Sequence, residues 1–247
     1  MIKNYNEYHY SQKEWIRYFI EGLVISTIVG LLFYSNIIGV ILLSPFGFYY
    51  VKMKRKEIIE KRKWQLNLEF RDSLLSISSA LNAGYSIENA FEQTVEDLKV
   101  MYPKDALIIR EFESMVNQIK MNVTIEKVLL DFAERSTIED IANFSAVFTT
   151  AKRTGGDLIK IIRNTSNTIG DKIEIKREIL TMITAKKFES KVMAMIPFCI
   201  ILYLRFFSPG FLNPLYNNII GFLIMSVLLV IYLFAYKIAD KIMRIEV

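Results

Sequence analysis

The chain has 247 residues, 52% of them hydrophobic, with 31 Lys and Arg against 26 Asp and Glu and a net charge of +5. This small basic excess comes without a nucleic-acid-binding motif, so we expect no nucleic-acid partner. The single cysteine, Cys199, excludes an intramolecular disulfide and a cysteine-based zinc site, and the single histidine, His9, has no cluster of ligands around it. The first apolar run starts late and lacks a small-residue cleavage site, so we expect no cleaved signal peptide.

The N-terminal part consists of a polar tail and a long apolar run. Residues 1–17 are polar and aromatic, and we expect them to form a cytoplasmic tail without firm structure. Residues 18–51 carry one charge, Glu21, and as a single helix they would be about 50 Å long, against a hydrocarbon core of about 30 Å. The polar residues Tyr34-Ser35-Asn36 predict a turn near the middle. The run is therefore expected to be a transmembrane hairpin with spans over about 18–34 and 37–51.

One tilted span through residues 18–51 is the alternative to this hairpin. Charge favours the hairpin, because Lys and Arg flank both ends of the apolar run and none lies at the Ser35-Asn36 turn. Basic residues collect on the cytoplasmic side of membrane proteins, so both ends of the run are expected in the cytoplasm.

Residues 52–187 contain no apolar run long enough to cross a bilayer, and they predict a cytoplasmic helical domain. Their first part, residues 52–65, predicts a basic helix that leaves the membrane. After it, apolar residues recur at helical spacing, as in Leu66, Phe70 and Leu74. We expect about six helices in this part, over 66–82, 86–100, 104–121, 124–135, 137–154 and 156–187.

The first turn of this domain contains a glycine and a serine in positions typical of helix ends. Gly84 predicts a left-handed C-cap, and Ser86 predicts the N-cap of the next helix, with Glu88 in its first turn. The same order of hydroxyl, isoleucine and glutamate recurs from Thr124 and from Thr137, which predicts two further N-caps.

The last turn of the domain is glycine-rich. Gly155-Gly156 predicts a tight reversal, and Asp157 suits the start of the following helix. A glycine-rich turn before a helix can also bind phosphate. Here the P-loop spacing is absent and no strand precedes the turn, so a structural helix hairpin is the preferred interpretation.

The C-terminal part predicts a second transmembrane hairpin over residues 188–236. Residues 192–204 and Ile219–Tyr236 are uncharged, and Arg205 is expected to snorkel to the far interface. Residues 237–247 would form a cytoplasmic tail. The predicted fold class is an all-α integral membrane protein with a cytoplasmic bundle of about six helices between two transmembrane hairpins. An external loop would carry Pro209, Asn213, Pro214, Asn217 and Asn218, and the tail would carry Lys237, Lys241 and Arg244.

No set of residues in the sequence predicts catalysis, a cofactor site or a metal site. Acidic residues are frequent between 88 and 140 and alternate with apolar residues at helical spacing. They predict solvated helix faces or, alternatively, a docking surface.

Three stretches together resemble the type II secretion F family. They are FRDSLLSISSALNAGYSIENAF at Phe70–Phe91, AKRTGGDL at Ala151–Leu158, and the charged helix that runs into an apolar span over Lys172–Pro197. A single such domain with two spans on each side is similar to the tight-adherence (Tad/Flp) pilus platform proteins. Family members with two copies of the domain tend to have an acidic residue before this turn. The present chain has the basic pair Lys152-Arg153 there and so differs from those members.

The resemblance implies a non-enzymatic platform protein, multi-pass in the cell inner membrane with both termini cytoplasmic. Its implied partners are a hexameric secretion-type ATPase, a second F-family platform protein or a second copy, pilin subunits, and the lipid bilayer. Glu88, Glu92 and Arg153 are the candidate contacts for the ATPase or another partner. A membrane subunit of an ATP-driven transporter is the alternative function, and a membrane enzyme is disfavoured by the missing catalytic set.

Overall fold

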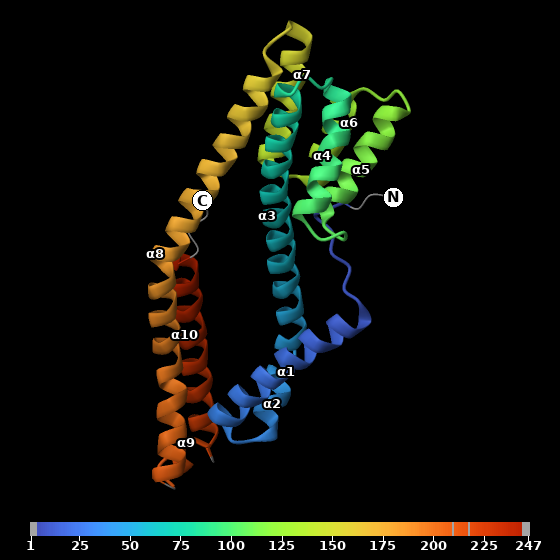
Figure 1. The fold of residues 1–247 in the computed structure, drawn as a ribbon. Coiled ribbons are helices and arrows are strands. Elements are labelled where there is room, and N and C mark those ends of the chain that lie inside the picture. The colour runs from blue at the N-terminus through green and yellow to red at the C-terminus, as the bar shows by residue number, and fades with distance from the viewer. Residues whose placement is uncertain (1–3, 209, 217, 244–247) are drawn as a thin grey trace. The chain divides into compact units, whose positions relative to one another are not determined.

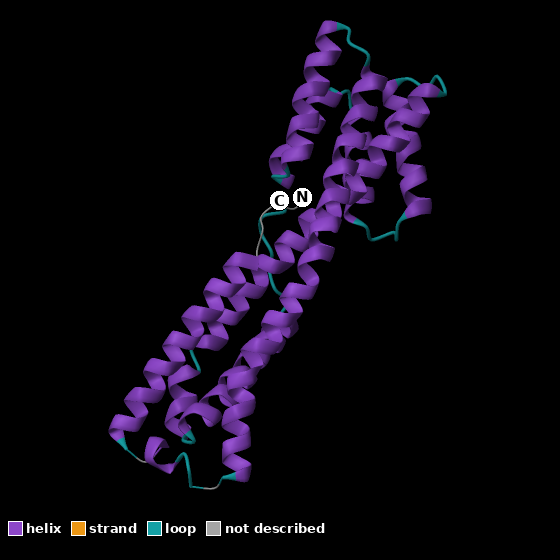
Figure 2. Cartoon of the chain, turned by 90° about the vertical axis from the view of Figure 1, so that its left-hand side faces the viewer, coloured by secondary structure: helices purple, strands orange, loops and turns teal. Residues whose placement is uncertain are grey.

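The computed structural model describes residues 4–208, 210–216 and 218–243. Helices make up its regular structure, and no strand occurs within these ranges (Figure 2). The predicted fold class, an all-α chain with apolar helices long enough for a membrane, is confirmed. In chain order the helices are α1 Gln12–Tyr34, α2 Ile37–Leu43, α3 Phe46–Asn82, α4 Ile87–Met101, α5 Leu107–Lys120, α6 Ile125–Ser136, α7 Glu139–Thr154, α8 Leu158–Phe207, α9 Asn213–Tyr216 and α10 Ile219–Met243.

Contacts divide the chain into two compact units, which we call the bundle and the apolar unit. The bundle comprises Met1–His9 and Arg55–Ile175, and the apolar unit comprises Tyr10–Lys54 and Lys176–Val247. Helices α4 to α7 belong to the bundle, and α1, α2, α9 and α10 belong to the apolar unit. Helices α3 and α8 have residues in both units.

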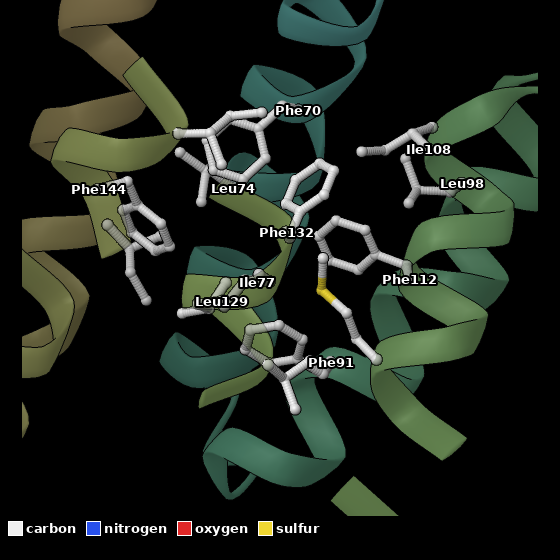
Figure 3. Close-up of a cluster of buried hydrophobic side chains, with 14 of the residues drawn as sticks. Phe70, Leu74, Ile77, Phe91, Leu98, Ile108, Phe112, Leu129, Phe132 and Phe144 are labelled. Atoms are coloured by element: carbon white, nitrogen blue, oxygen red, sulfur yellow. The ribbon is translucent and has the colours of Figure 1, made fainter. Parts of the chain in front are cut away.

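The bundle is built around a core rich in phenylalanine (Figure 3). The ring centre of Phe70 on α3 lies 6.0 Å from that of Phe132 on α6 and 5.6 Å from that of Phe144 on α7. Phe91 on α4 and Phe112 on α5 stack at 5.7 Å. All five rings are at most 1% exposed, so burial of their apolar area, at about 25 cal/mol per Å², holds these helices together.

Two helix boundaries predicted from the sequence are absent. The basic helix expected over 52–65 and the helix expected over 66–82 form one helix, α3, which begins at Phe46. No proline or glycine interrupts residues 48–82, so the backbone continues where the composition changes from basic to mixed. The helix expected over 156–187 likewise continues as α8 through Pro197, because a proline is tolerated in apolar membrane-type helices.

The helix caps stand where the sequence pattern predicts them at two of three positions, and one of these two has the side-chain hydrogen bond. The Ser86 hydroxyl accepts a hydrogen bond from the N–H of Asn89 at 3.3 Å, after Gly84 at φ +91°. Thr124 is the N-cap of α6 as predicted, but its side chain makes no cap hydrogen bond. The cap predicted at Thr137 is wrong, because Thr137 is the left-handed C-cap of α6 and Ile138 precedes α7.

The N-terminal segment, for which no firm structure was expected, is docked on the bundle. Tyr5 is 5% exposed and belongs to the bundle core, and its N–H donates to the carbonyl of Arg135 at 3.1 Å. The Asn6 side-chain oxygen accepts hydrogen bonds from Lys63 and from the hydroxyl of Thr137. Contacts with residues more than 50 positions away order this segment, and no local pattern encodes them.

The apolar unit begins with α1, which starts earlier than the predicted span. Ser11 and Glu14 form a capping box that begins the helix at Gln12 rather than near residue 18. The span expected over 37–51 consists of α2 and the start of α3, separated at Ser44-Pro45. By length and composition, four helical stretches in the described residues are able to cross a membrane.

Small residues bring α1 close to the helices that follow it. Gly22, Ser26 and Gly30 lie one turn apart and are all buried. A Cβ added at Gly22 would lie 2.9 Å from the Cα of Gly47, and one added at Gly30 would lie 2.9 Å from backbone atoms of Val40. Small residues at this spacing allow close backbone contact between membrane helices. The four-residue spacing of Gly22, Ser26 and Gly30 is a local sequence signal for this packing.

A Gly30→Ala variant tests this close packing. The added methyl group would meet the Val40 backbone, which cannot move as a side chain can, and overpacking of this kind typically costs about 1–3 kcal/mol. We expect a lower thermal unfolding midpoint for the purified chain in mild detergent. Val24→Ala, at a position that is 51% exposed on the same helix, is the control and should change the midpoint little. Equal midpoints for the two variants would contradict the packing argument.

The structure adds two details to the expectation for the C-terminal apolar segments. The guanidinium of Arg205, expected to snorkel, donates from Nη1 to the carbonyl of Leu31 at 3.1 Å and from Nη2 to the Ser35 hydroxyl at 3.2 Å. Helix α10 continues past residue 237 to Met243, so the described part of the expected tail is helical. The predictions for Pro209, Asn217 and Arg244 fall outside the described residues.

Candidate functional site

Three turns of the bundle lie at the same end of it (Figure 1). Successive helices are antiparallel, as two ion pairs show. Lys120 near the end of α5 pairs with Glu92 near the start of α4 at 2.6 Å, and Lys152 near the end of α7 pairs with Glu126 at the start of α6 at 3.0 Å. The turns that precede α4, α6 and α8 therefore lie at the same end of the bundle. We call this end of the bundle the turn face; it is formed by the turns at residues 83–86, 121–124 and 155–157.

The glycine-rich turn between α7 and α8 is held by its own backbone. Gly155 has φ +70°, and the N–H of Gly156 donates to the carbonyl of Ala151 at 2.8 Å, which ends α7. The Asp157 carboxylate accepts from the N–H of Lys160 at 3.0 Å at the start of α8. This carboxylate takes the place that a bound phosphate would need, so the geometry favours a structural turn.

The three candidate partner contacts lie in helices that adjoin the turn face. Glu88 and Glu92 lie one turn apart on α4 and are exposed, and Arg153 is exposed in the last turn of α7. Glu92 is bound by Lys120, whereas no hydrogen bond or ion pair in the described residues joins Arg153 to either glutamate. All three are thus exposed near turns of this end of the bundle, and Arg153 is not linked to either glutamate.

The turn face also carries apolar side chains that the sequence analysis did not single out. Tyr85 is 48% exposed and Met121 is 75% exposed. A large apolar residue in an exposed turn was the signal that could have found them. A shallow hollow of about 380 Å³ lies between α7 and α8 and is lined by Ala146, Val147, Thr150, Ala151, Thr154, Gly156 and Ile161. Apolar anchors surrounded by charges are typical of surfaces that bind other proteins.

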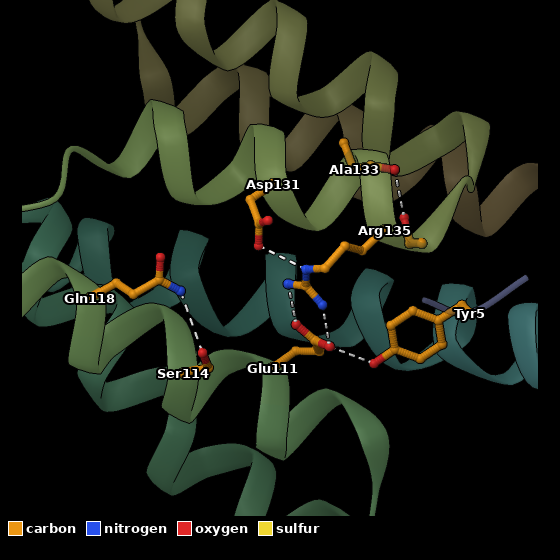
Figure 4. A network of polar contacts seen from close by, with 8 residues as sticks. Tyr5, Glu111, Ser114, Gln118, Asp131, Ala133 and Arg135 are labelled. Atoms are coloured by element: carbon orange, nitrogen blue, oxygen red, sulfur yellow. Dashed lines mark hydrogen bonds and ion pairs between the residues drawn. The ribbon is translucent and has the colours of Figure 1, made fainter. Parts of the chain in front are cut away.

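A buried polar network lies elsewhere in the bundle (Figure 4). The Glu111 side chain is 1% exposed, and its two oxygens accept from Nη1 and Nη2 of Arg135, both at 2.8 Å. The Tyr5 hydroxyl donates to the same carboxylate at 2.6 Å, and Nε of Arg135 donates to Asp131 at 2.8 Å. The network joins α5, α6 and the N-terminal segment, so its role is to hold that segment in place.

The network keeps its protonation states over the physiological range. Burial, together with the charge and hydrogen bond of Glu111, raises the pKa of the Tyr5 hydroxyl well above its ordinary value. Burial alone would lower the pKa of Arg135, but its hydrogen bonds to Glu111 and Asp131 outweigh this and raise that pKa. Tyr5 therefore remains a neutral donor, and Arg135 remains a cation.

Comparison with known families decides what kind of protein this is. The family described as Type II secretion system (T2SS), protein F, matches residues 73–204, more than half of the chain. The chain belongs to this F family. No curated protein and no solved structure matches it. F-family proteins are platform-type membrane proteins of secretion and pilus systems, and this chain is a membrane protein of that type.

The F-family match covers the turn face completely. It begins at Ser73 in α3 and ends at Leu204 in α8, so all three turns and α4 to α7 lie inside it. The docked N-terminal segment and helices α1 and α2 lie outside it. Within the described residues, no group of three or more His, Cys, Asp or Glu is placed to hold a metal ion.

Proposed function

We propose that this F-family protein is the inner-membrane platform of a tight-adherence (Tad/Flp-like) pilus machine. It would couple a cytoplasmic hexameric ATPase to the extraction of pilin subunits from the bilayer and their assembly into a filament, together with a second platform protein or a second copy. The observation that carries the proposal is a single F-family domain combined with four helical stretches able to cross a membrane. The proposal includes no catalytic role for the chain itself.

The docked N-terminal segment supports the proposed membrane topology. Tyr5 is part of the bundle core, so the N-terminus and the bundle share one side of the membrane. The intervening residues 10–54 must then cross an even number of times. This supports the hairpin and argues against one tilted span. Basic residues collect on the cytoplasmic side of a membrane, so those of α3 favour the cytoplasm as the shared side. They are Lys52, Lys54, Arg55, Lys56, Lys61, Arg62 and Lys63.

The turn face is the proposed contact for the ATPase. It combines exposed Tyr85 and Met121 with charges of both signs, among them Glu88 and Arg153. Helices α3 and α8 each run without interruption from bundle residues into apolar residues. A movement imposed on the bundle would pass along these two helices to the membrane segments.

A pull-down of the tagged chain from native membranes in mild detergent, with partners identified by mass spectrometry, tests the proposed function. The expected partners are a secretion-type ATPase, a second F-family protein and pilin-like subunits. Recovery of an ABC-type ATPase with a solute-binding protein would instead show a transporter subunit.

An Arg153→Glu variant tests the proposed ATPase contact. Reversing a charge inside an interface places like charges together, and we expect recovery of the ATPase to fall about tenfold or more. Lys104→Glu is the matched control, because Lys104 is also exposed but lies in the α4–α5 turn at the other end of the bundle. If both variants recover as much ATPase as the wild type, the turn face is not the contact.

A further inference from the structure

The basic residues at positions 52–63 of α3 divide into two groups by what they contact. One group has partners within the chain, which are a carboxylate, an amide or an aromatic ring. Its members are Lys54 over the Tyr50 ring, Lys61 with Glu57, Arg62 over the Tyr8 ring and Lys63 with the Asn6 amide oxygen. The other group is Lys52, Arg55 and Lys56, for which no ion pair, hydrogen bond or ring contact occurs within the described part of the chain.

The three cations of this second group lie together on one exposed face of α3. Residues three and four apart are neighbours on a helix surface, so Arg55 and Lys56 both lie next to Lys52. The Glu57 carboxylate is bound by a lysine on the opposite side of the helix. Glu60 lies one turn after Lys56, but among the described contacts it forms no ion pair with any of the three. The face therefore carries a positive charge that no carboxylate of α3 compensates.

An aromatic cluster indicates how deep this face lies in the membrane. Phe48 is exposed one helical turn before Lys52. Its ring centre is 4.9 Å from that of Phe19 and 6.3 Å from that of Trp15, and such aromatic clusters are typical of the membrane interface. At 1.5 Å per residue, Lys52 and Lys56 lie about 6 and 12 Å beyond Phe48. The headgroup layer is about 5–8 Å thick and lysine side chains are long, so the cations can reach lipid phosphates.

We propose that Lys52, Arg55 and Lys56 bind the headgroup of an anionic phospholipid, whose acyl chains lie along Phe48. Charge complementarity selects an anionic lipid over a zwitterionic one, because a zwitterionic headgroup brings its own cation. A free phosphate would meet the same cations but would leave the exposed ring of Phe48 without an apolar partner. Phosphate oxygens accept charge-assisted hydrogen bonds from ammonium and guanidinium groups. The inference is independent of the proposed pilus function, because it concerns only how α3 meets the membrane.

Quenching of tryptophan fluorescence by brominated lipids tests this site on the purified full-length chain in vesicles. A Trp64→Phe variant leaves Trp15, beside Phe48, as the single tryptophan, so quenching reports the lipid bound at this position. Vesicles of phosphatidylcholine receive either brominated phosphatidylglycerol, which is anionic, or brominated phosphatidylcholine. We expect phosphatidylglycerol to bind beside Trp15 about tenfold more tightly than phosphatidylcholine. Equal binding of the two lipids would overturn the proposal.

Paired variants of the Trp64→Phe chain assign the preference to the proposed face. Lys52→Gln/Lys56→Gln should reduce it to about twofold or less, because each cation near the membrane surface adds to the attraction of anionic lipid. Lys54→Gln/Lys61→Gln is the matched control, since it removes the same charge from the opposite side of α3, and it should keep the preference.

Quenching by brominated phosphatidylcholine at the level of the Trp64→Phe chain shows that each variant is folded in the membrane. An equal loss of preference in the two double variants would overturn the proposal, because general charge attraction would then explain the binding. Loss of the preference on addition of millimolar inorganic phosphate would overturn it in favour of a site for a free anion.

Discussion

An Ile173→Pro variant is expected to remain in the membrane but to assemble no filament. Ile173 lies in the interior of α8, 3% exposed, before the apolar part of that helix begins. A proline there removes a backbone hydrogen bond and clashes with the preceding turn, at a cost of about 3 kcal/mol or more. The helix would kink or end, and movement of the bundle would no longer reach the apolar end of α8.

Filaments on cells are counted by electron microscopy, and the variant is located by membrane fractionation. Because Ile173 also packs in the bundle core, Glu174→Pro gives a cleaner measurement at an exposed neighbour, and Glu174→Ala controls for loss of its side chain. We expect Glu174→Pro to lack filaments and Glu174→Ala to be normal. Normal piliation in either proline variant would refute the proposed role of α8.

A Glu111→Leu variant is expected to lose much of the stability of the bundle. Removing the carboxylate leaves the guanidinium of Arg135, 17% exposed, without its two-bond partner, and it also removes the acceptor of the Tyr5 hydroxyl. Breaking a buried ion pair in this way typically costs about 3–5 kcal/mol. The remaining bond from Arg135 to Asp131 places the expected loss toward the lower end of that range.

Thermal unfolding of the full chain in mild detergent measures this loss, and hydrogen exchange of the α5 and α6 amides locates it. The double variant Glu111→Leu/Arg135→Met removes both charges, and we expect it to recover most of the stability, because the burial cost of an uncompensated ion is gone. Tyr5→Phe should free the N-terminal segment for exchange with a smaller loss, about 1.5–3 kcal/mol for a hydrogen bond to a charged group. A double variant no more stable than Glu111→Leu would contradict this account.

Several elements were predictable because their signals are local. The apolar runs, the glycine turns at Gly84 and Gly155, and the cap at Ser86 each depend on a few neighbouring residues. Composition alone does not predict where a helix ends. The sequence changes from basic to mixed near residue 65, but α3 continues there because no glycine or proline interrupts it. At Thr137 the sequence pattern of a cap was present, but α6 ended in that residue first.

The sequence by itself determined that this is an all-helical membrane protein of the F family with a polar bundle among apolar helices. Hydrophobicity, helix caps and turn residues act over a few neighbouring positions, so their effects can be predicted from the sequence. Only the tertiary structure decided which distant residues meet. It joined Glu92 to Lys120 and Tyr5 to Glu111, and it set Arg205 against Leu31. Such contacts depend on how whole helices pack, and packing is set by the complete core rather than by any single stretch of sequence.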